Sequence, residues 1–371
     1  MEQATLVARG RARAKVNLRL EVLGRRPDGY HEISTVLHTI ELADELAVSL
    51  RLPPPSSPET ASAKPAGDPP AAVAIDLLCR PDLGIEPQNN LAYKAAAGMV
   101  AAWCAAGGRL PAGASIGIEL RKRIPLAAGL GGGSGDAAAV LRGLDALLGW
   151  CEQQPGSSWP QTMLARGFSP ECRSGRVNLH VLAERLGSDI PFLLTGGAAL
   201  GVGRGERLVP IDSRLRAPVL LAAPPLAVRA GEAYRWWDDA PAAAALADGG
   251  DGRDRPDGPT AADPRRGWSG RKLDDVAALA GGQVCNDLTA GVTERFPLVG
   301  RLIAAMREAG AAAAEMTGSG PVVFGVFTGP AVATAAQARL KAAFPDVTFI
   351  QSRLDPEPAA APQVAAGEGP P

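Results

Sequence analysis

The chain has 371 residues, of which 46% are hydrophobic and 21% are charged, proportions typical of a soluble globular protein. Its 38 basic and 39 acidic residues give a net charge of -1, so no overall field favours nucleic acid or an anionic membrane. The five cysteines form no CxxC pair and the three histidines no HExxH motif, which argues against a disulfide framework and against a zinc site. No apolar signal core opens the chain, so we expect a cytoplasmic protein without a membrane partner.

Strand-like and helix-like segments follow one another in a mixed order. Residues 12–24 and 115–124 alternate apolar and polar side chains, which indicates half-buried strands. Asn90 is a good N-cap and predicts a helix over the next 16 residues, 91–106. Further helices are predicted over 135–150 and 296–310, and 316–327 reads as a glycine loop before an apolar strand. The lack of a strict βαβα repeat favours an α+β fold.

Three segments are too rich in Pro, Gly and polar residues to contribute to a core. They span residues 53–72, 151–176 and 238–270. We expect surface insertions at all three, with the third largely disordered. The tail from residue 355 has the same composition and is also expected to be disordered.

A glycine-rich stretch, PLAAGLGGGSGDAAAVL, occupies residues 125–141. Glycine lets a ligand approach the backbone closely, and the free N–H groups of a first helical turn carry partial positive charge. A loop of this kind directly before a helix predicts an anion site. No lysine follows the glycines as in a Walker A loop, and the GxGxxG spacing of a dinucleotide site is absent. A flexible loop capped by Ser134 or Asp136 is the alternative.

Several motifs together resemble the GHMP kinase superfamily. The pattern PxxxGLGGGSxDAA is similar to its phosphate-binding motif, and GGGS points to one branch, the 4-diphosphocytidyl-2-C-methyl-D-erythritol kinases. The segments AKVNLRLEVLGRRPDGYHEISTVLHTIEL, LGSDIPFLLTGGAALGVGRGE, CNDLTAGVTERFP and MTGSGPVVFGVF resemble segments of that branch, in the same order. In the first of them the resemblance rests particularly on Lys15, Asn17, Arg26, Asp28, Gly29, Tyr30 and His31.

The resemblance implies a two-domain GHMP kinase fold of the α+β class. Residues 8–200 would form an N-terminal, ribosomal-S5-like α/β domain that carries the phosphate loop. Residues 201–354 would form a C-terminal, ferredoxin-like α/β domain. Residues 355–371 would remain as a disordered tail.

The resemblance also implies an activity, namely ATP-dependent phosphorylation of the 2-hydroxyl of 4-diphosphocytidyl-2-C-methyl-D-erythritol in the non-mevalonate isoprenoid pathway. Mg²⁺ is expected with ATP. The partner would be this small molecule and no nucleic acid, and the chain would be a monomer or a weak homodimer. A small-alcohol kinase such as a homoserine kinase is one alternative, against which Lys15, Tyr30 and His31 argue. A nucleotide-binding regulator without catalysis is another, against which the presence of Asp189 and Lys15 argues.

Catalytic and substrate-binding positions follow from the same resemblance. Asp189 would accept the proton of the acceptor hydroxyl or orient it, and Lys15 would keep that carboxylate ionised. A helix cap and a solvated strand lysine are the alternative interpretations. Asn17 would bind the erythritol part. Tyr30 would stack on the cytosine and His31 would pair with its edge.

The nucleotide would be held by a second set of residues. Asn90, besides capping a helix, would lie near the adenine, and Ser134 is a candidate magnesium ligand. Gly318, Ser319 and Gly320 would form a second loop that supports the phosphate loop and lines the substrate pocket. The phosphate loop itself would consist of Pro125, Gly129, Leu130, Gly131, Gly132, Gly133, Ser134 and Gly135.

Some positions depart from the family pattern. Leu226 stands where an aromatic residue is common, and the pair Arg229 and Ala230 replaces a Ser-Thr or Pro-Thr type pair. The second wall of the cytidine pocket is therefore not assigned by the sequence. Gly135 stands where relatives usually have Ser or Ala, and it predicts a looser first helical turn.

Overall fold

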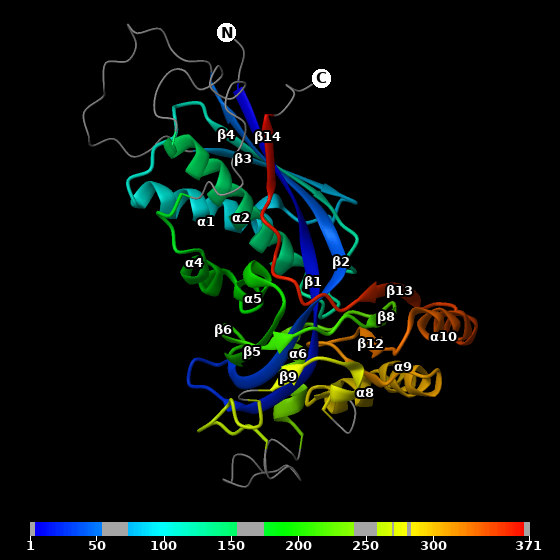
Figure 1. The fold of residues 1–371 in the computed structure, drawn as a ribbon. Helices are drawn as coiled ribbons and strands as arrows, with labels where there is room; N and C mark the ends of the chain where they lie inside the picture. Colours follow the sequence, from blue (N-terminus) through cyan, green and yellow to red (C-terminus); the bar gives the residue numbers. More distant parts are fainter. Residues whose placement is uncertain are drawn as a thin grey trace, which may run out of the picture.

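The computed structural model of the chain describes residues 4–53, 73–153, 174–240, 258–268, 271–279 and 283–366. Most of the predicted insertions at 53–72 and 151–176, and the centre of the third, lie outside these residues. The described chain forms two lobes, and two long strands run from one into the other (Figure 1).

The first lobe is built on an eight-stranded sheet of order β10-β1-β2-β4-β3, with β14 beside β1 and with β5 and then β6 beside β2. Its two longest strands, β1 (Ala4–Arg25) and β2 (His31–Leu52), form an antiparallel pair along almost their whole length. The other strands are β3 (Ala74–Arg80), β4 (Ser115–Arg121), β5 (Ala198–Gly203), β6 (Arg207–Pro210), β10 (Cys285–Asn286) and β14 (Gln363–Ala366).

Helices of the first lobe cover one face of this sheet (Figure 1). Their small aliphatic side chains, together with Trp103 and Phe192, pack on the sheet in one hydrophobic cluster. The helices are η2 (Pro87–Asn89), α1 (Leu91–Ala105), α2 (Gly132–Gln153), α4 (Leu179–Leu186) and α5 (Ile190–Thr195).

The second lobe contains a four-stranded antiparallel sheet of order β11-β12-β8-β13. The strands are β8 (Pro218–Ala223), β11 (Ala313–Met316), β12 (Val323–Val326) and β13 (Thr348–Arg353). The helices are α6 (Ala230–Asp238), α8 (Thr289–Arg295), α9 (Pro297–Glu308) and α10 (Pro330–Ala343). A short parallel pair, β7 (Asp212–Ser213) with β9 (Lys272–Leu273), and η3 (Val276–Leu279) complete the described elements.

The two lobes share a hydrophobic cluster. Val16 and Leu18 of β1 pack in it with Val219 of β8 and Phe324 of β12. Burial of such side chains stabilises the contact by about 1.5–3 kcal/mol each. Because β1 also packs against the helices of the first lobe, its position fixes both lobes at once.

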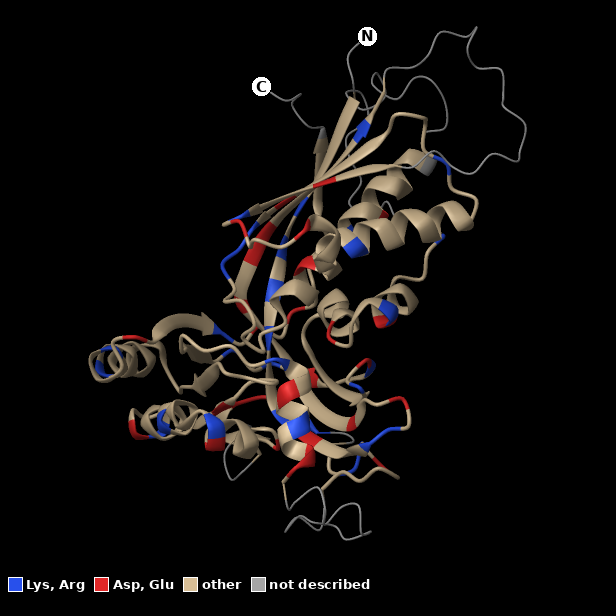
Figure 2. Cartoon of the chain, turned by 180° about the vertical axis from the view of Figure 1, so that it is seen from behind, with Lys and Arg blue, Asp and Glu red and all other residues tan. Residues whose placement is uncertain are grey.

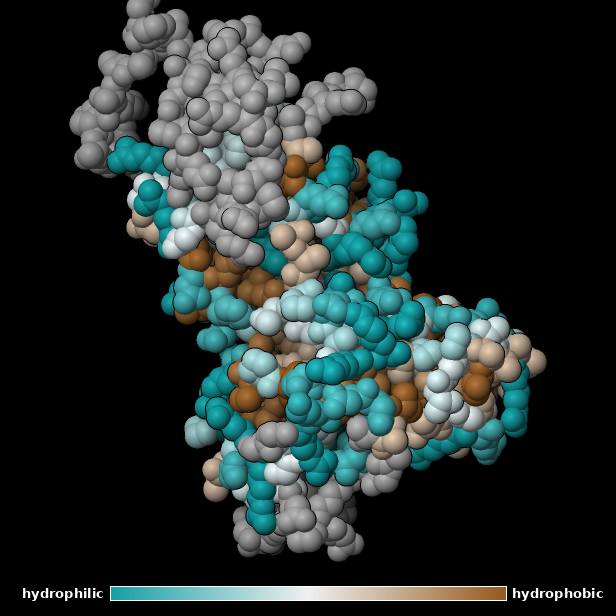
Figure 3. Space-filling model, in the orientation of Figure 1, coloured by the Kyte–Doolittle hydropathy of each residue, from teal (hydrophilic) through white to brown (hydrophobic). Residues whose placement is uncertain are grey.

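The surface of the described chain carries mixed charge. Basic and acidic residues are interspersed over both lobes (Figure 2). On the face seen in Figure 3 hydrophilic residues predominate, with hydrophobic patches between them. In the ranges that the structure describes, no helix is both long and apolar enough to span a bilayer.

Most predicted elements are confirmed. The α+β class, the strands over 12–24 and 115–124, the helix capped by Asn90 and the helix over 296–310 are all present. The helix after the glycine-rich stretch begins at Gly132, three residues earlier than predicted. The last glycines of the run therefore belong to the first turn of α2, and the loop itself is shorter.

Parts of two segments expected to be disordered are ordered where the structure describes the chain. In the tail, β14 pairs antiparallel with the edge of β1, and the Asp355 carboxylate lies 2.9 Å from the guanidinium of Arg13. In the third insertion, α6 continues to Asp238, and Trp268 is buried, with the guanidinium groups of Arg19 and Arg271 5.8 and 5.2 Å from its ring centroid. Pairing with a free strand edge and burial of an aromatic ring give a fixed structure to segments whose composition alone indicates disorder.

Glycine is required at two points where the phosphate loop meets other backbone. Gly129 has a φ of +72°, and a Cβ there would lie 2.1 Å from the carbonyl oxygen of Thr317. Gly135 lies in the first turn of α2, where a Cβ would lie 2.7 Å from the carbonyl oxygen of Arg13. Gly135 therefore lets α2 pack tightly on β1.

A buried ionic cluster anchors the start of α2. The ammonium of Lys122, which follows β4, hydrogen-bonds to Asp136 of α2 and to Asp44 of β2. All three side chains are at most 5% exposed. Asp136 therefore serves as an anchor and not as the cap that the sequence allows.

Not every polar atom of this cluster has a hydrogen-bond partner among the described residues. Burial raises the pKa of Asp136 to about 7, with the charge of Lys122 opposing and that of Asp44 adding to the shift. Its Oδ1 atom has no hydrogen-bond partner among the described residues. The charged form of Asp136 is therefore held at a cost to stability.

We expect Gly129→Ala to lower the free energy of unfolding by about 2 kcal/mol or more, because alanine is strained at positive φ and would contact the Thr317 carbonyl. The matched control is Gly133→Ala, whose Cβ would be in ordinary contact with Leu91 at 3.6 Å. Urea denaturation of both variants measures the difference. Equal stability of the two would contradict the packing described.

We expect Asp136→Asn to change how stability depends on pH. The native pKa near 7 lies above the unfolded value near 4, so the native state binds a proton that the unfolded state releases, and wild-type stability falls as the pH rises across this window. Asparagine cannot ionise. The stability of the variant relative to the wild type should therefore rise between about pH 4 and 7, measured by urea denaturation at each pH, and a flat difference would refute it.

Candidate active site

A pocket of about 680 Å³ opens where β1, β2, the phosphate loop, α6 and the loop after β11 meet. Most predicted site residues line it, although they are distant in sequence. Those in its wall are Lys15, Asn17, Tyr30, His31, Gly129, Gly131, Ser134, Asp189, Gly318 and Ser319. Seven predicted residues are not among those that line it, namely Asn90, Pro125, Leu130, Gly132, Gly133, Gly135 and Gly320.

An ion pair occupies the centre of this wall. Lys15 lies in the middle of β1 with its side chain only 4% exposed, so it is not a solvated strand lysine. Its Nζ lies 3.3 Å from Oδ2 of Asp189 and donates to Oδ1 of Asn17 at 2.6 Å. Asp189 precedes α5, but its carboxylate makes no capping hydrogen bond, and the side chain is 34% exposed. The carboxylate is thus free to meet a ligand while it is paired with a buried cation.

Asn17 is fixed on three sides. Its amide nitrogen donates to the hydroxyl of Thr35 at 2.8 Å, and that hydroxyl donates to the carbonyl of Arg19. Its backbone N–H donates to the hydroxyl of Thr317, 3.0 Å away in the loop after β11. The Asn17 side chain, which accepts the hydrogen bond from Lys15, is therefore held in one orientation. The bond from its backbone to Thr317 joins the two lobes.

The loop after β11 depends on a residue that sequence reasoning missed. The side chain of Asn286, in β10, donates to the carbonyls of Met316 and Gly318 at 2.9 and 2.7 Å. Gly318 has a φ of +56°, and a Cβ there would lie 3.3 Å from Nζ of Lys15. The motif CNDL contains the signal, because a buried asparagine must find partners for its amide.

The phosphate loop presents backbone to the pocket. The carbonyl of Leu130 accepts from the N–H of Lys15 at 2.9 Å, while its side chain is buried in the core. Gly131 has a φ of +71° and lies against the lysine stem, since a Cβ there would be 3.1 Å from Cγ of Lys15. Ser134 follows in the first turn of α2. The free N–H groups of this turn favour an anion beside Lys15.

Asn90 lies apart from this pocket. Its side chain accepts from the N–H of Ala92 at 2.9 Å and caps α1, as predicted. The next residue, Leu91, would be 3.6 Å from a Cβ at Gly133. The start of α1 thus lies beside the start of α2.

His31, at the start of β2, forms the opposite end of the pocket. Its ring stacks on Tyr234 with centroids 4.8 Å apart and meets the edge of Trp237 at 5.7 Å. Its Nε2 lies 2.8 Å from Oδ1 of Asp238. All three partners lie on α6 and were missed, although the i, i+3, i+4 spacing of YRWWD places them on one face of a helix.

The Tyr234 ring links this end to the centre. Burial, and then the charge of Asp189, raise the pKa of Tyr234 above its usual value, so its hydroxyl stays protonated. Of the three departing positions that bear on the second wall of the cytidine pocket, only Ala230 lines the pocket, at the start of α6. Leu226 and Arg229 are not among the lining residues.

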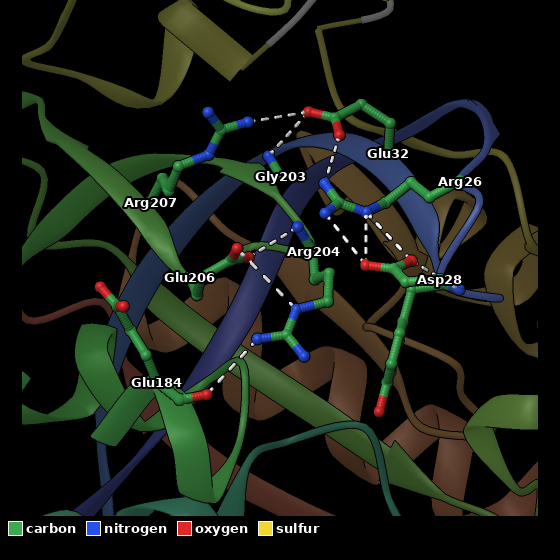
Figure 4. A network of polar contacts seen from close by, with 9 residues as sticks. Arg26, Asp28, Glu32, Glu184, Gly203, Arg204, Glu206 and Arg207 are labelled. Atoms are coloured by element: carbon green, nitrogen blue, oxygen red, sulfur yellow. Dashed lines mark hydrogen bonds and ion pairs between the residues drawn. The ribbon is translucent and has the colours of Figure 1, made fainter. Parts of the chain in front are cut away.

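Tyr30 lies at the mouth of the pocket. Its ring is 54% exposed, and the guanidinium of Arg204 lies 4.9 Å from its centroid. Arg204 is held by Glu206, whose carboxylate accepts from its backbone N–H at 2.6 Å, and by the carbonyl of Glu184 (Figure 4). A cation over the face of a tyrosine is attracted to the ring.

Ion pairs join the turn that carries Tyr30 to the turn that carries Arg204. Arg26 pairs with Asp28 at 3.0 Å and with Glu32 at 2.7 Å, and Glu32 also pairs with Arg207 at 3.1 Å (Figure 4). The Arg26 side chain lowers the pKa of the Asp28 carboxyl. The β1–β2 and β5–β6 turns are therefore fixed relative to one another.

Three kinds of surface thus meet in one pocket. One end offers backbone N–H groups and a helix start, the centre a lysine-paired carboxylate, and the other end aromatic rings with a histidine. Among the described residues, no group of three or more His, Cys, Asp or Glu side chains could hold a metal ion by itself.

Comparison with known proteins agrees with this arrangement. Residues 90–165 match the GHMP kinases N terminal domain and residues 271–346 the GHMP kinases C terminal model. A 4-diphosphocytidyl-2-C-methyl-D-erythritol kinase from a Synechococcus species is 37% identical over 96% of this chain and 95% of its own length.

Solved structures give the same result. A crystal structure of 4-(cytidine 5'-diphospho)-2C-methyl-D-erythritol kinase is 29% identical, with a TM-score of 0.58 over 93% of this chain and 98% of its own. A homoserine kinase from Cytophaga hutchinsonii shares the fold alone, at 15% identity and a TM-score of 0.52 over 98% of each chain. With the lysine-paired carboxylate beside a GLGGGS loop, these findings show that the chain belongs to the GHMP kinases and, within them, to the 4-diphosphocytidyl-2-C-methyl-D-erythritol kinase family.

Proposed function

We propose that the chain transfers the γ-phosphoryl group of ATP to the 2-hydroxyl of 4-diphosphocytidyl-2-C-methyl-D-erythritol, a step of the non-mevalonate isoprenoid pathway. The observation that carries the proposal is the position of Asp189. Its carboxylate, paired with Lys15, lies between an anion-binding loop and an aromatic end in one pocket. The names of the most similar relatives support the same substrate.

Asp189 would act on the acceptor hydroxyl. Phosphoryl transfer depends mainly on positioning and on electrostatic stabilisation, with a residue that orients the nucleophile and accepts its proton. Lys15, paired with that carboxylate at 3.3 Å, would shield the negative charge that develops nearby. Asn17, held rigidly by Thr35, would bind a hydroxyl of the erythritol part.

The phosphates of ATP would lie on the start of α2. The backbone at Gly129 and Gly131 allows a close approach, and the first-turn N–H groups face the anion. Magnesium that arrives with ATP takes most of its ligands from phosphate and water, so the lack of an acidic cluster in the described chain is compatible with it. Ser134 would offer its hydroxyl to that ion, which when bound would neutralise phosphate charge. Asn90 would lie on the adenine side.

The remaining assignments concern the base and the state of the protein. Tyr30 would stack on the cytosine and His31 would pair with its edge, while Gly318 and Ser319 would border the phosphates and the erythritol part. Arg204, beside Tyr30, would form the second wall. We further propose a cytoplasmic enzyme that acts as a monomer or a weak homodimer.

The substrate is tested by a coupled assay of ADP release with three acceptors supplied in parallel, 4-diphosphocytidyl-2-C-methyl-D-erythritol, homoserine and mevalonate. We expect turnover with the first alone, because the other two lack a base to fill the aromatic end of the pocket. Turnover with homoserine or mevalonate alone would refute the proposal.

Asp189→Asn should reduce kcat by about 10²–10⁴-fold, the usual contribution of a general base, while the Kd for ATP changes little. Single-turnover kinetics and ATP binding by calorimetry measure the two quantities separately. Asp346→Asn, at an exposed carboxylate of the second lobe, is the control. Equal loss of turnover and ATP affinity in Asp189→Asn would mean that this residue only supports the structure.

A further inference from the structure

Asp238 contacts the base end of the pocket, and neither the sequence motifs nor the phosphoryl transfer uses it. We infer that Asp238 fixes the proton of His31 on Nε2, so that Nδ1 faces the ligand as a hydrogen-bond acceptor and selects a pyrimidine with an exocyclic amine over one with a carbonyl. The inference rests on the proposed function, because it takes a pyrimidine nucleotide as the ligand. It makes Asp238 a positioning residue that acts through His31.

The contact itself determines which nitrogen carries a proton. Oδ1 of Asp238 lies 2.8 Å from Nε2 of His31. An ionised carboxylate accepts hydrogen bonds and donates none. Nε2 must therefore carry the hydrogen of this bond.

The other ring nitrogen is left for a ligand. Among the described residues, no hydrogen-bond partner reaches Nδ1 of His31, and the residue lines the pocket. In the neutral imidazole one ring nitrogen donates and the other accepts, so a hydrogen on Nε2 leaves Nδ1 as an acceptor.

The ring cannot exchange its two nitrogens easily. It is stacked on Tyr234 at an interplanar angle of 18° and meets Trp237 at 87°, and the residue is only 8% exposed. A flip of the ring would give up both the packing and the bond to Asp238. The direction of the acceptor is thus set by the contacts of His31 with α6.

An acceptor at this position distinguishes the two pyrimidines. Cytosine presents an amine at C4 and can donate to Nδ1, whereas uracil presents a carbonyl oxygen that would face another acceptor. A site whose polar group is left unpaired by the wrong ligand rejects that ligand strongly. Discrimination on the order of 100-fold in favour of cytosine follows from one such mismatch.

The first test reads the tautomer directly and needs no substrate. The full chain contains three histidines, so it can be labelled with ¹⁵N-histidine, and a His31→Gln variant assigns the His31 signals. Long-range ¹H–¹⁵N NMR at neutral pH should show Nε2 protonated and Nδ1 unprotonated. Protonation of Nδ1, alone or together with Nε2, would overturn the inference.

The second test measures base selection with cytidine diphosphate and uridine diphosphate as probes. A saturating concentration of a non-hydrolysable ATP analogue keeps both diphosphates out of the ATP site, and calorimetry gives their two Kd values. The wild type should prefer cytidine diphosphate by on the order of 100-fold. Asp238→Ala should reduce the preference to below about 10-fold, whereas Asp238→Asn, whose amide oxygen can still accept from Nε2, should stay within about threefold of the wild type.

Asp239→Ala is the matched control, because Asp239 is the next residue and is exposed; its preference should equal that of the wild type. If Asp238→Ala weakened both nucleotides equally, Asp238 would only shape the pocket and the inference would fail. If Asp238→Asn lost as much preference as Asp238→Ala, the accepted hydrogen bond would not be the cause, which also overturns it. Failure of the proposed function would be seen differently. The wild type would then give the expected results in both tests but would not turn over 4-diphosphocytidyl-2-C-methyl-D-erythritol.

Discussion

The burial of the Lys15 ammonium is the constraint on which the rest of the site depends. An ammonium taken out of water costs several kcal/mol unless charge and hydrogen bonds compensate it. Here Asp189 and Asn17 supply both, and each comes from a different element. The turn before α5 must therefore approach the middle of β1, and the central strand of the first lobe becomes the floor of a pocket.

Close approach of backbone follows from the same constraint. The phosphate loop and the loop after β11 both pass over the lysine, so neither can carry side chains where they meet. Gly129, Gly131 and Gly318 all have positive φ and would place a Cβ against backbone or against Lys15. Asn286 and Thr317 hold the second loop in this position through hydrogen bonds. The two lobes thus meet through backbone contacts around one buried charge.

Charge is distributed in layers around this centre. Behind the start of α2, the cluster of Asp44, Lys122 and Asp136 carries more acid than base and is closed off from solvent. On the pocket side, cationic side chains and helix N–H groups predominate. An anionic ligand is therefore drawn to the open side of α2, while the buried side serves to anchor the helix. Aromatic rings and Asp238 of α6 complete the far end.

How much could be predicted from the sequence depended on the range of the interactions. Alternation in β1, the cap at Asn90 and the glycine run before α2 are local signals, and each gave the right element, while the motif order gave the family. The order of the tail and of Trp268 was missed, because a strand edge and a buried ring stabilise segments whose composition alone indicates disorder. The second wall also stayed open, since no local pattern shows that Arg204 in the β5–β6 turn lies beside Tyr30.

The sequence by itself thus determined the elements, the family and ten of the 23 residues that line the pocket, because these depend on local periodicity and on motifs. Only the tertiary structure decided that Lys15 is buried and paired, that Gly135 packs against β1, and that Tyr234, Trp237 and Asp238 surround His31. The reason is physical: desolvation, close backbone contact and the tautomer of a histidine are set by neighbours brought together in space. Asp238 lies 207 residues from His31 in the chain, and only the fold brings their side chains into hydrogen-bonding contact.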